Sequence, residues 1–553
     1  MINKIIKVSL ITFLILIIGI LYLSFFGIKT DKFNNQITSS ILKINKEIKL
    51  NLRDVSYLLN PYDLTINIKT KNSKISLNSK NFEIKNIQTN VSLKSLINNQ
   101  FSIDDLKIVT KEIKLNDVVG LIRVFQDSPQ LFVLDTIIKD GIVTVSANLN
   151  FDDNGKIKKN YKIQGSVKKV KLKIIDKLKL QNLNFNFNID KNIYSLKRIE
   201  MKINEVKITS PLIEIQEKNN SFFVNGQFLN DKKIYEHEEI KEIFDNLPNN
   251  IDIKKIEFSS ENKFSFNVNK KLKFDNFNIE STVDLKQFIF NEQSLKLKPY
   301  LPSFVEEIKL NEHKITINYN KSKFDINGKG NILLDDKSDK ISYQITKDKN
   351  NLSFYSKIAL NNNSLLINFL DFEKKEDSNS VILIKGSLKK DSQLNLDLFN
   401  LKEKDNEIQI KGLKFNESFK IIDIENFAIN YKNNKKILNS LTLRKDKSNF
   451  IIIGESFDAS RIINNIMDSD EEGPSIFDNL NTKINVRIKK TYIDELNYIN
   501  NLSGNINYNN NKIDDLKLES IFPNEKKINL SIETKNKSEI ITRLFSAYPK
   551  PLV

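Results

Sequence analysis

Few residues in this sequence are of types that could catalyse a reaction or hold a metal ion. The 553 residues include no cysteine and only two histidines, His237 and His313. A chain without cysteine cannot form a disulfide, a thiolate zinc site, an iron–sulfur cluster or a cysteine nucleophile. We interpret His237 as a solvent-facing side chain on a charged helix and His313 as the head of a strand. We therefore predict no catalytic residue, no metal ligand and no cofactor.

Two short motifs approach known functional patterns, and each fails at one position. Residues 454–458 (GESFD) would match the G-x-S-x-G turn of a nucleophilic serine, but the last glycine is replaced by Asp458. Residues 152–155 (DDNG) begin like a calcium-binding loop, but no glutamate follows at the twelfth position. We predict a strand-to-helix turn at the first motif and a hairpin turn at the second.

The positive charge of the chain comes almost entirely from lysine. Lys and Arg together number 86 against 69 Asp and Glu, which gives a net charge of +17. Seven of the 86 are arginine, the residue best suited to bidentate phosphate and guanine contacts, and the remaining 79 are lysine (86 minus 7). The lysines are spread along the chain among Asp and Glu, so we interpret them as a solvated surface and predict no nucleic-acid partner.

The first predicted structural element is an apolar segment near the N-terminus. Residues 8–28 contain 21 consecutive uncharged residues, about the length that a helix needs to cross a bilayer. The segment is longer than the core of a cleavable signal and lacks a small-residue cleavage site, so an uncleaved signal-anchor is favoured over a cleaved signal. Lys4 and Lys7 place the N-terminus in the cytoplasm and the rest of the chain in the periplasm of a Gram-negative-type bacterium. The anchor residues that we single out are Val8, Leu14, Ile18, Leu21, Phe25 and Ile28.

From residue 48 onward the apolar pattern has a period of two, which is typical of strands with one apolar and one polar face. Turn signals such as Asn225-Gly226, Asn327-Gly328 and residues 361–363 (NNN) interrupt these runs every 8–15 residues. A similar six-residue sequence occurs at residues 103–108 (IDDLKI) and at residues 513–518 (IDDLKL). The sequence predicts a mainly β protein built on a long, repetitive antiparallel sheet.

Short helices are expected beside this sheet. Apolar residues at helical spacing predict helices at 115–122, 240–247, 300–308, 460–467 and 538–545. We divide the chain into a cytoplasmic stub and transmembrane anchor (1–28), a juxtamembrane amphipathic helix (29–47), a repetitive sheet (48–467), an acidic linker (468–475) and a further, incomplete part of the sheet (476–553).

The apolar strand faces have two interpretations from the residues alone. They could form the closed core of a sandwich or barrel, or they could line a groove for an apolar ligand, because the sequence lacks long helices to cover the sheet. Judged on the residues alone, the closed core is favoured. The candidate groove residues are Leu183, Phe185, Phe187, Ile189, Phe264, Phe266, Val268, Leu394, Leu396 and Leu398.

Several stretches carry a resemblance to a known family. Residues 82–87 (FEIKNI), 91–97 (VSLKSLI) and 101–108 (FSIDDLKI) follow the anchor and the juxtamembrane helix. This order of parts resembles the AsmA-like family, the group that includes AsmA, TamB and YhdP. Residues 137–142 (IIKDGI) and 451–461 (IIIGESFDASR) are similar to the YhdP branch with its central domain.

The resemblance implies a long sheet curled into an elongated hydrophobic groove that is anchored in the inner membrane. Proteins of this family are considered bridge-like conduits that bring phospholipids toward the outer membrane, and this favours the groove over the closed core. The expected partners are the inner membrane, phospholipids and outer-membrane or periplasmic proteins. Larger relatives continue well beyond this length, so the resemblance also indicates a truncated chain or a split gene.

Two other functions remain as alternatives. A periplasmic assembly factor for outer-membrane β-barrel proteins would pair exposed strand edges with client strands. An enzyme acting on envelope polymers is the third, and we find no acid, base, nucleophile or metal constellation for it in the sequence.

Overall fold

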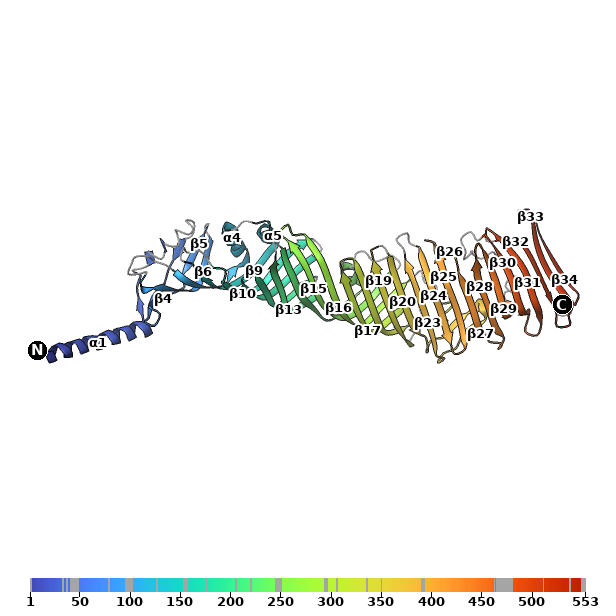
Figure 1. The fold of residues 1–553 in the computed structure, drawn as a ribbon, viewed down its shortest axis with the longest axis horizontal. Coiled ribbons are helices and arrows are strands. Elements are labelled where there is room, and N and C mark those ends of the chain that lie inside the picture. The colour runs from blue at the N-terminus through green and yellow to red at the C-terminus, as the bar shows by residue number, and fades with distance from the viewer. Residues whose placement is uncertain are drawn as a thin grey trace. The chain divides into compact units, whose positions relative to one another are not determined.

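The computed structural model is mainly β-sheet, with 69% of the described residues in strands and 12% in helices (Figure 1). It describes residues 2–548 except for gaps at 32–33, 36–37, 40–48, 78–79, 95–102, 126–127, 153–157, 176–177, 204–205, 219–220, 244–250, 293–296, 305–306, 335–336, 350, 389–392, 462, 464–480, 511 and 537–538. Thirty-two of the described strands belong to one hydrogen-bonded sheet, and two short strands pair separately. The prediction of a mainly β, antiparallel fold is confirmed.

The chain divides into two compact units. Unit 1 comprises Met1–Asp231 and Glu261–Asn278, and unit 2 comprises Lys232–Ser260 and Ile279–Val553. Three strands contribute residues to both units: β14 (Ser221–Glu236), β15 (Ile251–Asn269) and β16 (Phe274–Glu292).

Unit 1 begins with a long helix, and its later strands, from residue 138 to residue 231, pair with one another in chain order. The other elements of unit 1 are α1 (Ile2–Phe25), β1 (Ile28–Lys29), β2 (Lys49–Asn51), β3 (Ser56–Asn60), β4 (Thr65–Lys71), β5 (Lys74–Leu77), β6 (Lys80–Ser92), β7 (Ile103–Thr110), β8 (Ile113–Lys114), α4 (Leu115–Phe125), α5 (Pro129–Ile137), β9 (Ile138–Asn150), β10 (Lys162–Ile175), β11 (Leu178–Asp190), β12 (Ile193–Ile203) and β13 (Val206–Lys218).

Unit 2 contains the longest run of strands that pair in chain order. Its elements are α6 (His237–Ile243), β17 (Ile308–Asn320), β18 (Lys323–Leu333), β19 (Ser338–Asp348), β20 (Asn351–Ala359), β21 (Leu365–Ile367), η1 (Asn368–Leu370), β22 (Phe372–Lys374), β23 (Ser380–Leu388), β24 (Leu394–Glu403), β25 (Asn406–Phe415), β26 (Ile421–Asp423), β27 (Asn426–Lys432), β28 (Leu438–Asp446), β29 (Asn449–Asp458), β30 (Thr482–Tyr492), β31 (Tyr498–Asn509), β32 (Lys512–Ile521), β33 (Lys527–Asn536) and β34 (Glu539–Ser546).

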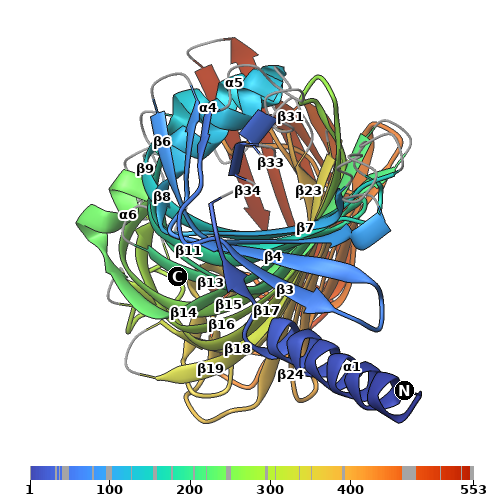
Figure 2. The same cartoon turned by 90° about the vertical axis from the view of Figure 1, so that its left-hand side faces the viewer.

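The helices α4 and α5 cover part of the sheet in unit 1 (Figure 2). Leu115 and Val118 of α4 pack against a buried cluster that includes Val143 and Val167 of the strands. The helix α5 was not predicted from the sequence. Ser128 caps it and Pro129 occupies its first turn, where a missing N–H costs nothing and the fixed φ of proline suits a helix.

Two of the predicted helices are wrong. Residues 300–304 and 307 form turns and irregular backbone, and Ile308 already begins β17. Residues 539–546 form β34, which pairs with β33 so that Leu544 lies opposite Leu530. The spacing of Ile540 and Leu544 fits a helix and a strand equally well, and the ladder of hydrogen bonds to β33 decides between them.

The other predicted helices fall partly outside the described residues. Residues 115–122 lie within α4, which confirms that helix, and α6 covers the start of the segment 240–247. Ser460, Arg461 and Ile463 are helical, and the rest of that prediction lies outside the described residues. Of the juxtamembrane segment, residues 34–35 and 38–39 are helical, Lys29 belongs to β1, and the remainder is largely outside the described residues, as are residues 468–475.

Among the described strand pairs, one is parallel rather than antiparallel as predicted. β30 pairs with β29 in parallel, with Ile452 opposite Val486. The strands of a parallel pair run in the same direction, so the chain must return to the end where β29 began before β30 starts. The connection that does so spans residues 459–481, which includes the predicted acidic linker, so the strands on both sides of that linker pair directly with each other.

Two predicted turns, at Asn225-Gly226 and Asn327-Gly328, instead lie inside β14 and β18. A Cβ on Gly226 would meet the ring of Phe264 at 2.8 Å, and a Cβ on Gly328 would meet the ring of Tyr343 at 2.2 Å. These glycines therefore serve close packing of an aromatic ring from a neighbouring strand rather than chain reversal. The same arrangement places Phe187 beside Gly165 and Phe354 beside Gly386.

The ring over Gly328 gives a direct test of this packing. The three atoms nearest to a Cβ at Gly328 all belong to the Tyr343 side chain. We expect Gly328→Ala to destabilise the protein by about 1–3 kcal/mol, because overpacking forces the ring away. In a Tyr343→Ala background we expect Gly328→Ala to be neutral or slightly stabilising. The ring is then absent, and alanine lowers the conformational entropy of the unfolded chain. Thermal unfolding of the four proteins followed by circular dichroism measures this cycle, and equal shifts of the midpoint in both backgrounds would contradict it.

Candidate functional site

Paired residues on neighbouring strands of unit 2 form a continuous line that we call the apolar row. Side chains of directly paired residues lie on the same face, so each pair extends the row by one strand. The row crosses fifteen strands from β17 to β34, and every member except Ser356 is apolar, aromatic or glycine. Its members are Ile315, Gly328, Tyr343, Ser356, Ile384, Phe399, Ile410, Phe427, Leu443, Ile452, Val486, Gly504, Leu518, Leu530 and Leu544.

Two further rows on the same face flank the apolar row. The covered row runs through Gly330, Ile341, Ile358, Ile382, Leu401, Ile408, Ile429, Leu441, Gly454, Ile488 and Leu502. The outer row runs through Ile317, Ile326, Ile345, Phe354, Gly386, Leu396 and Leu413.

The three rows differ in burial. The covered row is buried from Ile382 to Ile488. In the apolar row all members are half-buried except Gly328 and Val486, which are buried, and Leu544, which is 57% exposed. The outer row is also half-buried except at Gly386 and Leu413. A closed core would bury these large side chains almost completely, so this face is only partly covered by protein.

The covered row owes its burial to a segment that we call the cap, residues 297–304 and 360–372. Phe304, Leu360 and Phe372 of the cap belong to the same buried cluster as the middle of the covered row. The two parts of the cap are joined by the Leu366 N–H, which donates to the Tyr300 carbonyl at 2.8 Å. The hydroxyl of Tyr431 in β27 also donates to the Leu370 carbonyl.

A buried lysine fixes the end of the cap. The Lys374 side chain is 0% exposed, and its Nζ donates to the carbonyls of Asn361 at 2.7 Å and Asn363 at 2.6 Å. The Asp339 carboxylate accepts hydrogen bonds from the backbone N–H groups of Asn361 and Asn362. Burial lowers the pKa of Lys374, while Asp339 and Glu403 oppose that shift. The predicted turn at residues 361–363 is therefore present and is held by charged side chains.

In unit 1 the corresponding apolar face is partly covered by α4. A row of paired residues runs through Val145, Gly165, Phe187, Leu196, Ile213 and Gly226. Of the predicted groove residues, Leu183, Phe185 and Phe187 pack against the buried cluster beneath α4. Ile189 pairs with Ile163 and Tyr194 on the same face, and all four predicted residues are half-buried.

The predicted residues of β15 lie in a cluster of phenylalanines. Phe264 stacks on Phe228 with the ring centroids 4.8 Å apart, and Phe266 lies 5.5 Å from Phe274 and 5.8 Å from Phe277. Phe274 is 69% exposed and Phe277 is 38% exposed. Val268, like Phe264 and Phe266, is half-buried.

Leu398 does not share a face with the other predicted residues of β24. Leu396 belongs to the outer row, and Leu394 lies on the same face. Leu398 pairs directly with Lys385 and Lys411, which are exposed on the opposite face. An irregularity around Asp397, opposite Gly412 with φ of +61°, shifts the alternation by one residue. The assignment of Leu398 to the apolar face is therefore wrong.

The predicted anchor forms a helix that makes few contacts with the sheet. Ile6–Phe25 of α1 is long and apolar enough to span a membrane and has none of its length buried. The side chains of Val8, Leu14, Ile18, Leu21 and Phe25 are at least 49% exposed. Ile28 lies beyond the helix, in β1, where it pairs with Tyr57.

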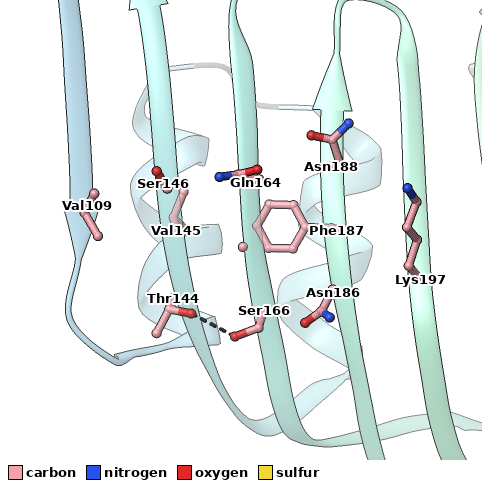
Figure 3. Close-up of a pocket in the computed structure, with 11 residues that line it drawn as sticks. Val109, Thr144, Val145, Ser146, Gln164, Ser166, Asn186, Phe187, Asn188 and Lys197 are labelled. Atoms are coloured by element: carbon pink, nitrogen blue, oxygen red, sulfur yellow. Dashed lines mark hydrogen bonds between the residues drawn. The ribbon is translucent and has the colours of Figure 1, made fainter.

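The opposite face of the sheet is polar and carries its own hollows. In unit 1 a hollow of about 590 Å³ is lined by amides and hydroxyls of β9, β10 and β11, together with Lys197 of β12 and Val109 of β7 (Figure 3). The hydroxyls of Thr144 and Ser166 lie 2.8 Å apart with Asn186 beside them, whereas Gln164 and Asn188 lie toward the other end of the hollow.

The residues weighed for catalysis do not assemble into a site in the described part of the chain. Ser456 lies inside β29, paired with Ser440 and Lys490, so residues 454–458 are not the expected strand-to-helix turn; the helix begins at Ser460. His237 begins α6 and is half-buried, with Nδ1 2.8 Å from the Ile253 carbonyl. Among the described residues no three His, Asp or Glu side chains are grouped to hold a metal ion. Of the hairpin turn predicted at residues 152–155, residues 153–155 lie outside the described residues.

His313 is buried within β17 rather than at the head of a strand. Its ring is 0% exposed and lies against Gly330, where a Cβ would meet the ring at 2.2 Å. Its Nε2 lies 2.9 Å from the Asn331 carbonyl and its Nδ1 lies 3.3 Å from the Tyr343 hydroxyl. Because a carbonyl only accepts, Nε2 carries the proton and Nδ1 accepts from Tyr343. Burial lowers the pKa of His313 below its usual value.

Sequence reasoning missed the cap, the buried ring of His313 and the rows of paired residues. The pair Gly328 and Gly330, separated by one residue within a strand-like run, was the available signal, because glycine inside a strand marks a close approach. Comparison with known proteins adds no family to this description: no family model, no curated protein and no solved structure matches the chain.

The environment of His313 predicts that mild acid destabilises the sheet. The pKa of the folded state is lower than the value of 6.5 expected for the unfolded chain, so the unfolded chain binds the proton more readily. The stabilisation from neutral His313 is present above pH about 6.5 and is lost as the pH falls through the folded pKa. Thermal midpoints measured from pH 8 to pH 5 should fall less for His313→Gln than for the wild type. His237→Gln is the control and should follow the wild type, whereas parallel curves for His313→Gln and the wild type would refute the role of His313.

Proposed function

We propose that this chain is a membrane-anchored bridge that carries phospholipids along the apolar face of its sheet from the inner toward the outer membrane. The observation that carries the proposal is the apolar row, which continues in register across fifteen strands without a charged residue. The half-burial of its side chains supports a face that is completed by an apolar ligand rather than by protein.

The energetics of such a face favour holding and moving an acyl chain. Each methylene removed from water contributes about 0.8 kcal/mol, and the attraction requires no particular geometry. Neighbouring strands present the same kinds of side chain at a spacing of about 4.8 Å, so the binding free energy changes little from one strand to the next. Fifteen strands at this spacing give a path of roughly 70 Å within unit 2.

The width of the open face suits a lipid with two acyl chains. Residues two apart on a strand are separated by about 6.7 Å, so the apolar row and the outer row lie side by side at roughly that distance. The cap occupies the covered row and leaves the other two rows mostly half-buried over β17 to β25, with Gly328, Gly386 and Leu413 buried. These two rows form parallel apolar tracks that fit the two acyl chains of a phospholipid whose headgroup stays in water.

The anchor and the resemblance support the proposed location. Lys4 and Lys7 precede the apolar part of α1, and the excess of positive charge on the cytoplasmic side favours an N-terminus inside and the sheet in the periplasm. The resemblance of residues 82–108 to the AsmA-like family agrees with curling of the sheet into a groove and with a role in envelope integrity. On this proposal the protein is not an enzyme and needs no cofactor.

A second candidate function rests on β34. Among the described strands β34 pairs only with β33, and its Ile540, Leu544 and Phe545 are 57–63% exposed. An exposed apolar edge strand can pair with another chain, as an assembly factor for outer-membrane β-barrel proteins would require.

Site-specific photocrosslinking separates the two functions. Phe354 lies in the outer row, whereas Ser353, the preceding residue, lies on the polar face and is exposed. We expect p-benzoylphenylalanine in place of Phe354 to crosslink to phospholipid in cells, as detected by mass spectrometry of the purified protein. The same probe in place of Ser353 is the control and should give at least about tenfold less lipid adduct, because alternate residues face opposite sides.

The crosslinking results distinguish lipid transport from the assembly-factor function. Equal lipid labelling at both positions, or none at Phe354, would exclude transport along this face. Crosslinks from a probe at Ile540 to unfolded outer-membrane proteins, without lipid at Phe354, would favour the assembly factor.

A further inference from the structure

The polar face of β17–β20 in unit 2 carries a trough lined by lysines. One part has a volume of about 460 Å³ and is lined by Lys314, Lys329, Lys340 and Lys357. An adjoining part of about 380 Å³ shares Lys314, Lys329 and Ser342 and extends toward Tyr355. The lysines come from all four strands, and their side chains are exposed. This volume is in the range of small-molecule sites.

The lysines of the trough lack the carboxylate partners that some other lysines on this face have. No ion pair within 4.0 Å joins Lys314, Lys329, Lys340 or Lys357 to a described carboxylate. By contrast, nearby Lys323 lies 3.1 Å from Asp325, and Lys402 lies 3.5 Å from Glu407.

Pairing register makes this cluster of charge unfavourable in the absence of a ligand. Lys314 lies directly opposite Lys329, and like charges in directly opposed positions repel. Ser342 separates Lys329 from Lys357 in the same cross-strand row. The lining contains one carboxylate, Glu312, so the trough has a charge of +3 (four lysines minus one glutamate). An anion bound there would relieve this repulsion.

The strand β17, which contributes Lys314 to the trough, contains an extra residue in its pairing with β18. Glu312 has a φ of +52°, and the register shifts by one residue between Asn311 and Lys314. The extra residue turns His313 to the apolar face, where its ring is buried and bonded to the Asn331 carbonyl. Bulges of this kind re-aim side chains at binding sites, and the buried ring fixes the strand that carries Lys314.

We propose that this trough binds a ligand carrying two or more phosphate charges. Lysine ammonium groups bind phosphate oxygens as point charges through short, charge-assisted hydrogen bonds. The hydroxyl of Ser342 and the amide of Asn331 in the lining add neutral partners for the same oxygens. The trough lies on the face opposite to the apolar row, so the proposal does not depend on lipid transport along that row.

The test is a binding titration on the full chain held in nanodiscs of zwitterionic phosphatidylcholine. Pyrophosphate is the probe, and inorganic phosphate, with fewer charges, is expected to bind more weakly. The Lys329→Gln/Lys357→Gln variant should lose at least about tenfold in affinity, because each charge-assisted contact is strong. Raising the salt concentration should weaken binding to the wild type.

The matched control removes the same charge outside the trough. Lys347 and Lys349 are exposed at the turn between β19 and β20 and do not line the trough, so Lys347→Gln/Lys349→Gln should bind pyrophosphate within about twofold of the wild type. Equal losses in both variants, or no binding by the wild type to any of the phosphate probes, would overturn the proposal.

A second probe identifies the source of the phosphate. Short-chain, water-soluble phosphatidic acid presents a phosphate monoester, with up to two negative charges, on a lipid headgroup. If its binding depends on Lys329 and Lys357 and exceeds that of pyrophosphate, the natural ligand is a headgroup; the reverse order identifies a soluble phosphate compound.

Discussion

Cross-strand register is the constraint on which the rest of this structure depends. Successive residues of a strand point to opposite faces, so a slip of one residue would move every apolar side chain of that strand to the polar face. The apolar row keeps its register over fifteen strands despite several irregularities. At β24 and β25 the strands skip Asp397 and Gly412 together, and Phe399 therefore still meets Ile410 on the apolar face. The strand β23 has no matching extra residue, and its Ile384 still meets Phe399 on the apolar face.

The same register explains the unusual use of glycine and aromatic residues. A large ring that lies flat across the sheet needs space over the neighbouring strand, and glycine provides it. Phe187 has Gly165 as its direct partner, Tyr343 has Gly328, and Phe354 has Gly386. At each of these pairs the ring lies so close to the glycine that a Cβ there would clash with it.

Sequence reasoning reached the parts of this fold that depend on local pattern. The period of two, the long apolar helix and the helix at residues 115–122 follow from hydrophobic spacing, which neighbouring strands do not alter. Sequence reasoning failed where a neighbouring strand determines the face or the conformation of a residue. Leu398 follows the alternation of Leu394 and Leu396 in sequence, but the irregularity at Asp397 moves it to the lysine face. Residues 539–546 have apolar spacing that suits a helix, and pairing with β33 makes them a strand.

A sheet that lacks a complete second layer can use both of its faces, and this chain distributes different chemistry between them. Tyr343 on the apolar face and Ser342 in the lysine trough are consecutive residues of β19. His313 belongs to the same arrangement, because its ring packs on the apolar side of Gly330 while Lys314, the next residue, lines the trough. The packing that completes one face thus positions the charges of the other. Changes at alternate residues of a single strand can therefore separate the function of the apolar row from that of the trough.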